Sequence, residues 1–132
     1  MRVFAAVILC IVGLAAPPAS AQLAAELRVT CWLADVGVFA NRVHVHCSNG
    51  PPGGGLVSHL PPPRPDPNVV YFAVGAVSDP NLANRVVALA TAAMQQGKQV
   101  EVQYRSDPLE NPPGCLTADC RRLTGLVLMA QP

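Results

Sequence analysis

The chain has 132 residues, of which 51% are hydrophobic and 13% charged, and its formal net charge is +1 at pH 7. This balance lacks the basic field that nucleic-acid-binding proteins use, so the sequence predicts no nucleic-acid partner. Arg121 and Arg122 are the only adjacent basic residues, and such a pair is typical of a solvated turn.

The first 21 residues have the pattern of a secretory signal peptide. Arg2 supplies a positive charge, Val3 to Leu14 form an apolar core, and Ala19-Ser20-Ala21 is a small-residue cleavage site. No later segment reaches the roughly 18 apolar residues of a membrane span. We therefore expect cleavage near Ala21, a single exported domain over residues 22–132, and a secreted or periplasmic location.

Four cysteines remain beyond the predicted signal peptide: Cys31, Cys47, Cys115 and Cys120. An even number in a small exported domain favours disulfides. Cys115 and Cys120 flank a short polar turn, so we expect them to pair, which leaves Cys31 for Cys47. Zinc is the alternative use of four cysteines, although neither pair has the two-residue spacer typical of zinc sites.

Two strands with a turn between them are predicted near the start of this domain. Residues 27–36 are rich in Val, Leu, Thr and Trp, and residues 42–47 alternate apolar and polar side chains around a turn at 37–41. His44 and His46 then share one face of the second strand. They are either two ligands of a metal that lacks an evident third ligand, or histidines on an exposed strand face, and we predict no metal site.

Residues 48–67 contain half of the fourteen prolines and three consecutive glycines. This composition predicts a surface loop that interrupts the domain, and not a linker between two domains. A proline-rich ligand for a groove on another protein is the alternative function of this segment.

A strand, a helix and another strand follow in close succession. Residues 69–74 are bulky and β-branched, Ser78-Asp79-Pro80 is a helix start, and Gly97 is placed for a left-handed helix end. Residues 100–105 alternate as a half-buried strand. The predicted apolar face of the helix consists of Leu82, Val86, Leu89, Ala90 and Ala93.

The last expected elements are a loop at 106–119 and a buried strand at 123–129. The full order is then β-β-β-α-β-β, which is mainly β, with one helix between the third and fourth of five strands. This is the order of a five-stranded OB-fold-like barrel, although an α+β sandwich shares it.

Several short segments resemble small exported bacterial proteins related to the B subunit of subtilase cytotoxin, a group that includes the typhoid toxin B subunit. They are Tyr71-Phe72-Ala73-Val74, Ser78-Asp79-Pro80-Asn81, Gly97-Lys98-Gln99-Val100 with Tyr104, and the closing pair Cys115 and Cys120. The resemblance spans roughly residues 43–128. It implies an OB-fold, a homo-pentameric ring, an exported catalytic subunit as partner, and sialylated glycans as ligands.

The chain departs from these toxin subunits at two places. They use a serine on the first strand to receive the sialic acid carboxylate, whereas Thr30 is the nearest hydroxyl here. They also pair cysteines on the second and third strands, whereas the third strand here carries Ala73 in that place.

Four residues are candidates for a ligand site: Thr30, Trp32, Tyr104 and Arg105. Trp32 is either a platform for a sugar ring or the cover of a core edge. Tyr104 and Arg105 end a strand near loops that many OB-folds use for recognition, and a hydroxyl with a guanidinium suits a carboxylated sugar. The alternative is an edge tyrosine and a solvated arginine.

The sequence shows no recognisable combination of a catalytic nucleophile, a general base and a residue that orients the base. We therefore predict that the protein is not an enzyme and needs no cofactor. Two functions remain. One is a secreted glycan-binding module like a toxin B subunit. The other is a periplasmic or secreted OB-fold protein with a protein-binding or structural role.

Overall fold

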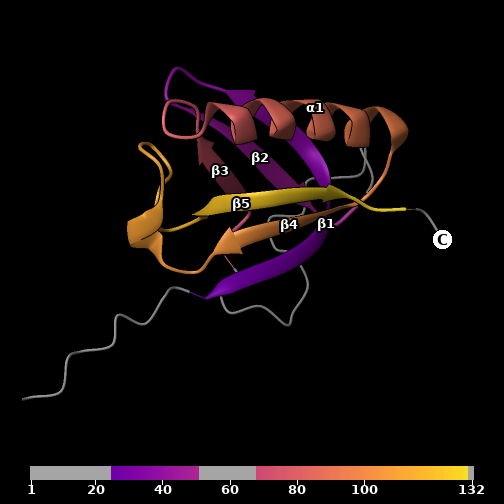
Figure 1. The fold of residues 1–132 in the computed structure, drawn as a ribbon. Helices are drawn as coiled ribbons and strands as arrows, with labels where there is room; N and C mark the ends of the chain where they lie inside the picture. The colour runs from indigo at the N-terminus through magenta and orange to yellow at the C-terminus, as the bar shows by residue number, and fades with distance from the viewer. Residues whose placement is uncertain (1–24, 51–67, 131–132) are drawn as a thin grey trace, which may run out of the picture.

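The computed structural model describes residues 25–50 and 68–130, which form a mainly β structure with five strands and one long helix (Figure 1). The predicted order β-β-β-α-β-β is confirmed. The predicted signal peptide at 1–21 and most of the Pro/Gly-rich loop lie outside the described residues. The elements are β1 (Glu26–Val38), β2 (Arg42–Ser48), β3 (Tyr71–Gly75), α1 (Pro80–Gln96), β4 (Val100–Arg105), the 3₁₀ turn η1 (Pro108–Glu110) and β5 (Cys120–Leu128).

The long first strand joins the two halves of the sheet. Its first half, Glu26–Cys31, pairs antiparallel with β4, and its second half, Trp32–Val38, pairs antiparallel with β2. β2 pairs with β3, a short parallel contact joins β3 to β5, and β5 returns to β4. The hydrogen-bonded order β1-β2-β3-β5-β4 therefore closes on β1.

Both ends of α1 are formed by the residues that the sequence singles out. The Asp79 side chain accepts a hydrogen bond from the backbone N–H of Leu82 at 3.0 Å, and Pro80 occupies the first turn. Gly97 ends the helix with φ at 60°, a left-handed conformation in which a glycine has no Cβ to clash.

The helix lies on one side of the strands, alongside β5 (Figure 1), and packs its small side chains into the core. The buried residues of α1 are Ala83, Val86, Ala90 and Ala93. Leu89, which the sequence places on the buried face, is only half-buried, as is Leu82. The reason is that both leucines lie on the flank of the helix beside β5, where a hollow opens between the two elements.

The core contains one of the two disulfides and a pair of aromatic rings. Cys31 and Cys47 form one disulfide, with 2% and 0% of their surfaces exposed, and Cys115 and Cys120 form the other. The predicted pairing is confirmed, and the zinc alternative is wrong because all four sulfurs are bonded in pairs. The rings of Phe72 and Tyr104 lie in the same core as the Cys31–Cys47 disulfide, with 4.8 Å between the ring centroids.

β5 starts three residues earlier than the sequence pattern indicates, because Cys120 to Arg122 pair with β3. The adjacent arginines are therefore in a strand, and the expectation of a solvated turn is wrong. Arg121 is 7% exposed, and its Nη1 donates to the carbonyl oxygens of Thr117 and Cys120 at 2.7 and 2.8 Å. Arg122 stays exposed.

Candidate functional site

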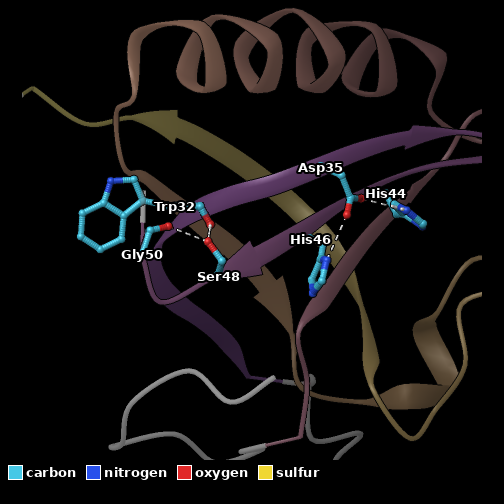
Figure 2. A network of polar contacts seen from close by, with 6 residues as sticks. All are labelled: Trp32, Asp35, His44, His46, Ser48 and Gly50. Atoms are coloured by element: carbon cyan, nitrogen blue, oxygen red, sulfur yellow. Dashed lines mark hydrogen bonds and ion pairs between the residues drawn. The ribbon is translucent and has the colours of Figure 1, made fainter. Parts of the chain in front are cut away.

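The four residues predicted to bind a ligand do not gather at one place. Thr30 and Trp32 share the outer face of β1 and reach solvent, and Figure 2 shows the Trp32 indole directed away from the strands. Tyr104 is 2% exposed and its ring packs in the core. Arg105 lies opposite Glu26, and Thr30 lies opposite Glu101. Because Glu101 and Arg105 are four residues apart on β4, Thr30 and Arg105 are separated by roughly 13 Å along the strands.

A different group of polar side chains does gather, on the outer face of β1 and β2. The carboxylate of Asp35 lies between two histidines: its Oδ2 is 3.0 Å from Nδ1 of His46, and its Oδ1 is 3.7 Å from Nε2 of His44 (Figure 2). The histidine side chains are 19% and 14% exposed, whereas that of Asp35 is 53% exposed. The histidines are thus largely covered, and the carboxylate faces the solvent.

Asp35 reaches this face because β1 carries an irregularity. Leu33 lies opposite Cys47 and Asp35 lies opposite His46, so Ala34 is an extra residue with no partner of its own on β2. Such a bulge reverses the alternation beyond it. Leu33 is buried, so regular alternation of side chains would direct Asp35 into the core as well. Because of the bulge, Asp35 instead points outward and Val36 packs against the core.

Aromatic rings surround the two histidines. The Tyr71 ring stacks on His46 with 4.4 Å between ring centroids and lies 5.3 Å from His44. Phe39, from the turn between β1 and β2, lies 5.0 Å from His44, and the Arg42 guanidinium covers the Phe39 ring at 4.3 Å. We call Asp35, His44, His46 and Tyr71 the Asp–His–Tyr face.

A hollow of about 140 Å³ adjoins this face. His44 and Tyr71 form one side, and the loop closed by the Cys115–Cys120 disulfide forms the other. Gly114 in that loop has φ at 82°, and a Cβ there would collide with the Arg42 guanidinium. The glycine therefore lets the loop approach Arg42 closely. Usual ligand pockets measure about 300–1,000 Å³, so this hollow suits one substituent of a larger ligand.

Burial lowers the pKa of His44 below its usual value of 6.5. The charge of Asp35 opposes this effect, whereas the charges of Arg42 and His46 add to it. His44 is consequently neutral at pH 7 and offers one nitrogen that donates and one that accepts a hydrogen bond.

The Asp–His–Tyr face can hydrogen-bond polar groups in both directions and stack on a flat apolar surface. A carboxylate only accepts, so Nδ1 of His46 donates to Asp35, while the solvent-facing carboxylate can accept from a ligand. Two imidazoles and a carboxylate are also metal-ligand types. Within residues 25–50 and 68–130, however, no group of three or more such side chains has an arrangement that could hold a metal ion. His59 lies outside the described residues.

Sequence reasoning recognised that His44 and His46 share a face but missed their two partners. Asp35 could not be assigned to that face, because the bulge at Ala34 has no clear sequence signal. Tyr71 comes from a strand that is 25 residues away from His46 along the chain, on the far side of the Pro/Gly-rich loop. Tyr71 lies on this face because β2 and β3 pair in a register that puts it opposite His46.

Comparisons of the chain with protein-family models, with curated proteins and with solved structures returned no match. None of the helices in the described parts of the chain is long and apolar enough to cross a membrane.

Proposed function

We propose that this chain is an exported glycan-binding module with an OB-fold-like barrel, as its resemblance to subtilase-type toxin B subunits implies. The closed strand order β1-β2-β3-β5-β4, with α1 between β3 and β4, is the arrangement expected of such a barrel. Two disulfides agree with an oxidising compartment, either the periplasm or the exterior of the cell. Cleavage of a signal peptide near Ala21 is part of the same proposal.

The observation that carries the proposal is the Asp–His–Tyr face beside its hollow. Sugar hydroxyls both donate and accept hydrogen bonds, and the carboxylate of Asp35 with the imidazole nitrogens of His44 and His46 meets both needs. The C–H face of a sugar ring suits the aromatic rings of Tyr71 and Phe39, of which Phe39 is 43% exposed.

This arrangement favours binding over catalysis. An Asp–His pair can act as a base, but the described residues bring no serine or free cysteine to it as a nucleophile, since the four described cysteines are bonded to one another. Among the described residues, Asp35 is the carboxylate ion-paired with the histidines, and Asp119 lines the adjoining hollow without an ion pair to either of them.

A second function, recognition of a protein partner or a structural role, is favoured by apolar side chains that reach solvent. Val77 is 80% exposed and Leu109 is 90% exposed. Singly exposed apolar residues are common on monomers, so these two indicate a protein interface only if they are covered in an assembly.

A homo-pentamer with an exported catalytic subunit is the assembly that the resemblance implies. Sedimentation velocity of the purified exported protein measures its mass in solution. A species of about five chains supports the ring, and a monomer at every concentration removes it. Co-expression with any exported protein encoded beside it, followed by purification on one tag, tests the catalytic partner.

The glycan proposal itself is tested by a glycan array probed with the exported, oxidised chain. We expect binding to a related set of glycans that share one terminal sugar, and loss of this binding after reduction of the disulfides. If no glycan is retained while a protein partner co-purifies, the second function replaces the first.

A further inference from the structure

A second surface, distinct from the Asp–His–Tyr face, lies between the helix and the last strand. A hollow of about 350 Å³ opens there between the α1 residues Leu82, Arg85 and Leu89 and the β5 residues Thr124 and Val127. We call this hollow, defined by those five residues, the α1–β5 groove. Leu82 and Leu89 are half-buried and Val127 is 44% exposed, so apolar side chains that reach solvent form part of its walls, beside the polar Arg85, Gln103 and Thr124.

Residues of β5, with Gln103 of β4 beside them, form one side of the groove. β5 pairs with β3 only through Cys120 to Arg122, whereas it pairs with β4 at Leu123 and again from Gly125 to Leu128, with Thr124 as an extra residue between them. In the described parts of the chain, the later residues of β5 have no strand on the side opposite β4. The regular part of this edge begins at Gly125, beyond the extra residue Thr124, and alternate backbone N–H and C=O groups from there to Leu128 are available to another strand.

One buried polar atom in the groove also lacks a partner. The Oγ1 of Thr124 is buried and forms no hydrogen bond with the described residues. Leu82 and Thr124 also line a further hollow of about 370 Å³ toward η1, which contains Asp79 and Glu110, so the part of the surface without acidic residues ends at the α1–β5 groove. A hydroxyl can rotate toward a peptide group that lies along such a surface.

Charge restricts what the groove can hold. Arg85 is exposed at its wall and forms no ion pair with the described residues, and none of the residues that line the groove is acidic. The groove therefore combines an open strand edge, apolar walls and one unpaired positive charge. An extended peptide chain satisfies the strand edge, which a helix or a small molecule would leave unpaired.

We propose that the α1–β5 groove binds an extended peptide segment of a protein partner, which adds a strand to the edge of β5. The segment alternates apolar residues, which pack between Leu89 and Val127, with at least one carboxylate that pairs with Arg85. This binding is independent of the glycan proposal, since the Asp–His–Tyr face lies on β1, β2 and β3.

The test uses a fluorescent eight-residue peptide of alternating valine and glutamate, and anisotropy of the full exported chain titrated into it. Two control peptides separate the contributions: one has lysine in place of glutamate, and one carries N-methyl groups that block pairing along one edge. Two chain variants lose one positive charge each. Arg85→Gln changes the groove, and Lys98→Gln changes a residue outside it.

We expect the glutamate peptide to bind, and the lysine and N-methylated peptides to bind at least tenfold more weakly. Arg85→Gln should weaken binding about two- to fivefold, the range of an exposed ion pair, while Lys98→Gln leaves it unchanged. Arg85→Glu should restore binding of the lysine peptide. Melting temperatures of the variants within about 2 °C of the parent show that they are folded.

Any one of four results overturns the proposal. The glutamate peptide fails to bind at millimolar concentration, or the N-methylated peptide binds equally well, or Lys98→Gln weakens binding as much as Arg85→Gln. The proposal is also contradicted if the parent chain is an oligomer that Arg85→Gln dissociates, and neither the parent nor the variant binds the peptide. A second copy of the chain would then occupy the groove.

Discussion

The carboxylate of Asp35 lies 3.0 Å from Nδ1 of His46 because one extra residue in β1 turns that carboxylate out of the core. Without the bulge at Ala34, alternation from the buried Leu33 would direct an ionisable side chain inward, where an unpaired charge is costly. The bulge thus avoids a buried charge and places the carboxylate beside two histidines.

The two disulfides are expected to contribute unequally to stability. Cys31 and Cys47 are 16 residues apart and Cys115 and Cys120 are 5 apart, so the chain-entropy model gives roughly 3 kcal/mol for the first and roughly 2 kcal/mol for the second. Replacing both members of a pair by alanine and measuring the melting temperature tests this order. We expect the larger decrease for the first pair, and the reverse order would show that loop closure does not control the difference.

The same substitution at two leucines tests the packing of the helix. Leu123 is 1% exposed in the core, so Leu123→Ala should lower the free energy of unfolding by roughly 2–5 kcal/mol. Leu89 is half-buried beside β5, and Leu89→Ala should cost only about 1 kcal/mol because part of its surface already contacts water. Urea denaturation of both variants gives the comparison. An equal loss of unfolding free energy in the two variants would mean that Leu89 is as fully buried in solution as Leu123.

Stability should depend on the protonation of His44. Burial lowers its pKa in the folded chain, so the unfolded chain binds the proton more readily below pH 6.5. The contribution of His44 to stability is therefore complete above pH 6.5 and is lost as the pH falls through the lowered pKa of the folded state. Among the described residues, the side chains near His44 are Asp35, Arg42, His46, Phe39 and Tyr71, and Asp119 lines the hollow that His44 adjoins.

Melting temperatures at pH 7.5 and pH 5.0 test this dependence in the parent and in His44→Gln, which cannot titrate. Carboxylates elsewhere titrate in both chains, so the difference between the two chains isolates His44. We expect a smaller decrease in the variant. An identical decrease in both chains would show that His44 is protonated equally well when folded and unfolded.

Local sequence signals predicted the elements of this fold better than they predicted its site. The cap at Asp79, the stop at Gly97 and the alternation over residues 100–105 each depend on neighbouring residues, and the structure has them at the predicted positions. The burial of Leu89 was predicted wrongly, because helical periodicity does not show how far a helix flank is covered.

The candidate site depends on relationships that are distant in the sequence. Periodicity placed His44 and His46 on one face, but the bulge brings Asp35 there and strand pairing brings Tyr71 there. Tyr104 looked like a ligand residue at a strand end, yet its position opposite Leu27 turns its ring into the core beside Phe72. Strand register and bulges have weak sequence signals, so these placements required the structure.

The central claim is that the Asp–His–Tyr face binds a glycan, and titration calorimetry on an array-identified glycan tests it most directly. The parent chain is compared with Asp35→Asn, with His46→Ala, and with Trp32→Ala, which changes the other candidate surface on β1. We predict that Asp35→Asn and His46→Ala weaken binding at least tenfold, while Trp32→Ala leaves it within twofold and all three stay folded. Unchanged affinity in the first two variants, with loss of binding in Trp32→Ala, would contradict the account and move the site to the surface formed by Thr30 and Trp32.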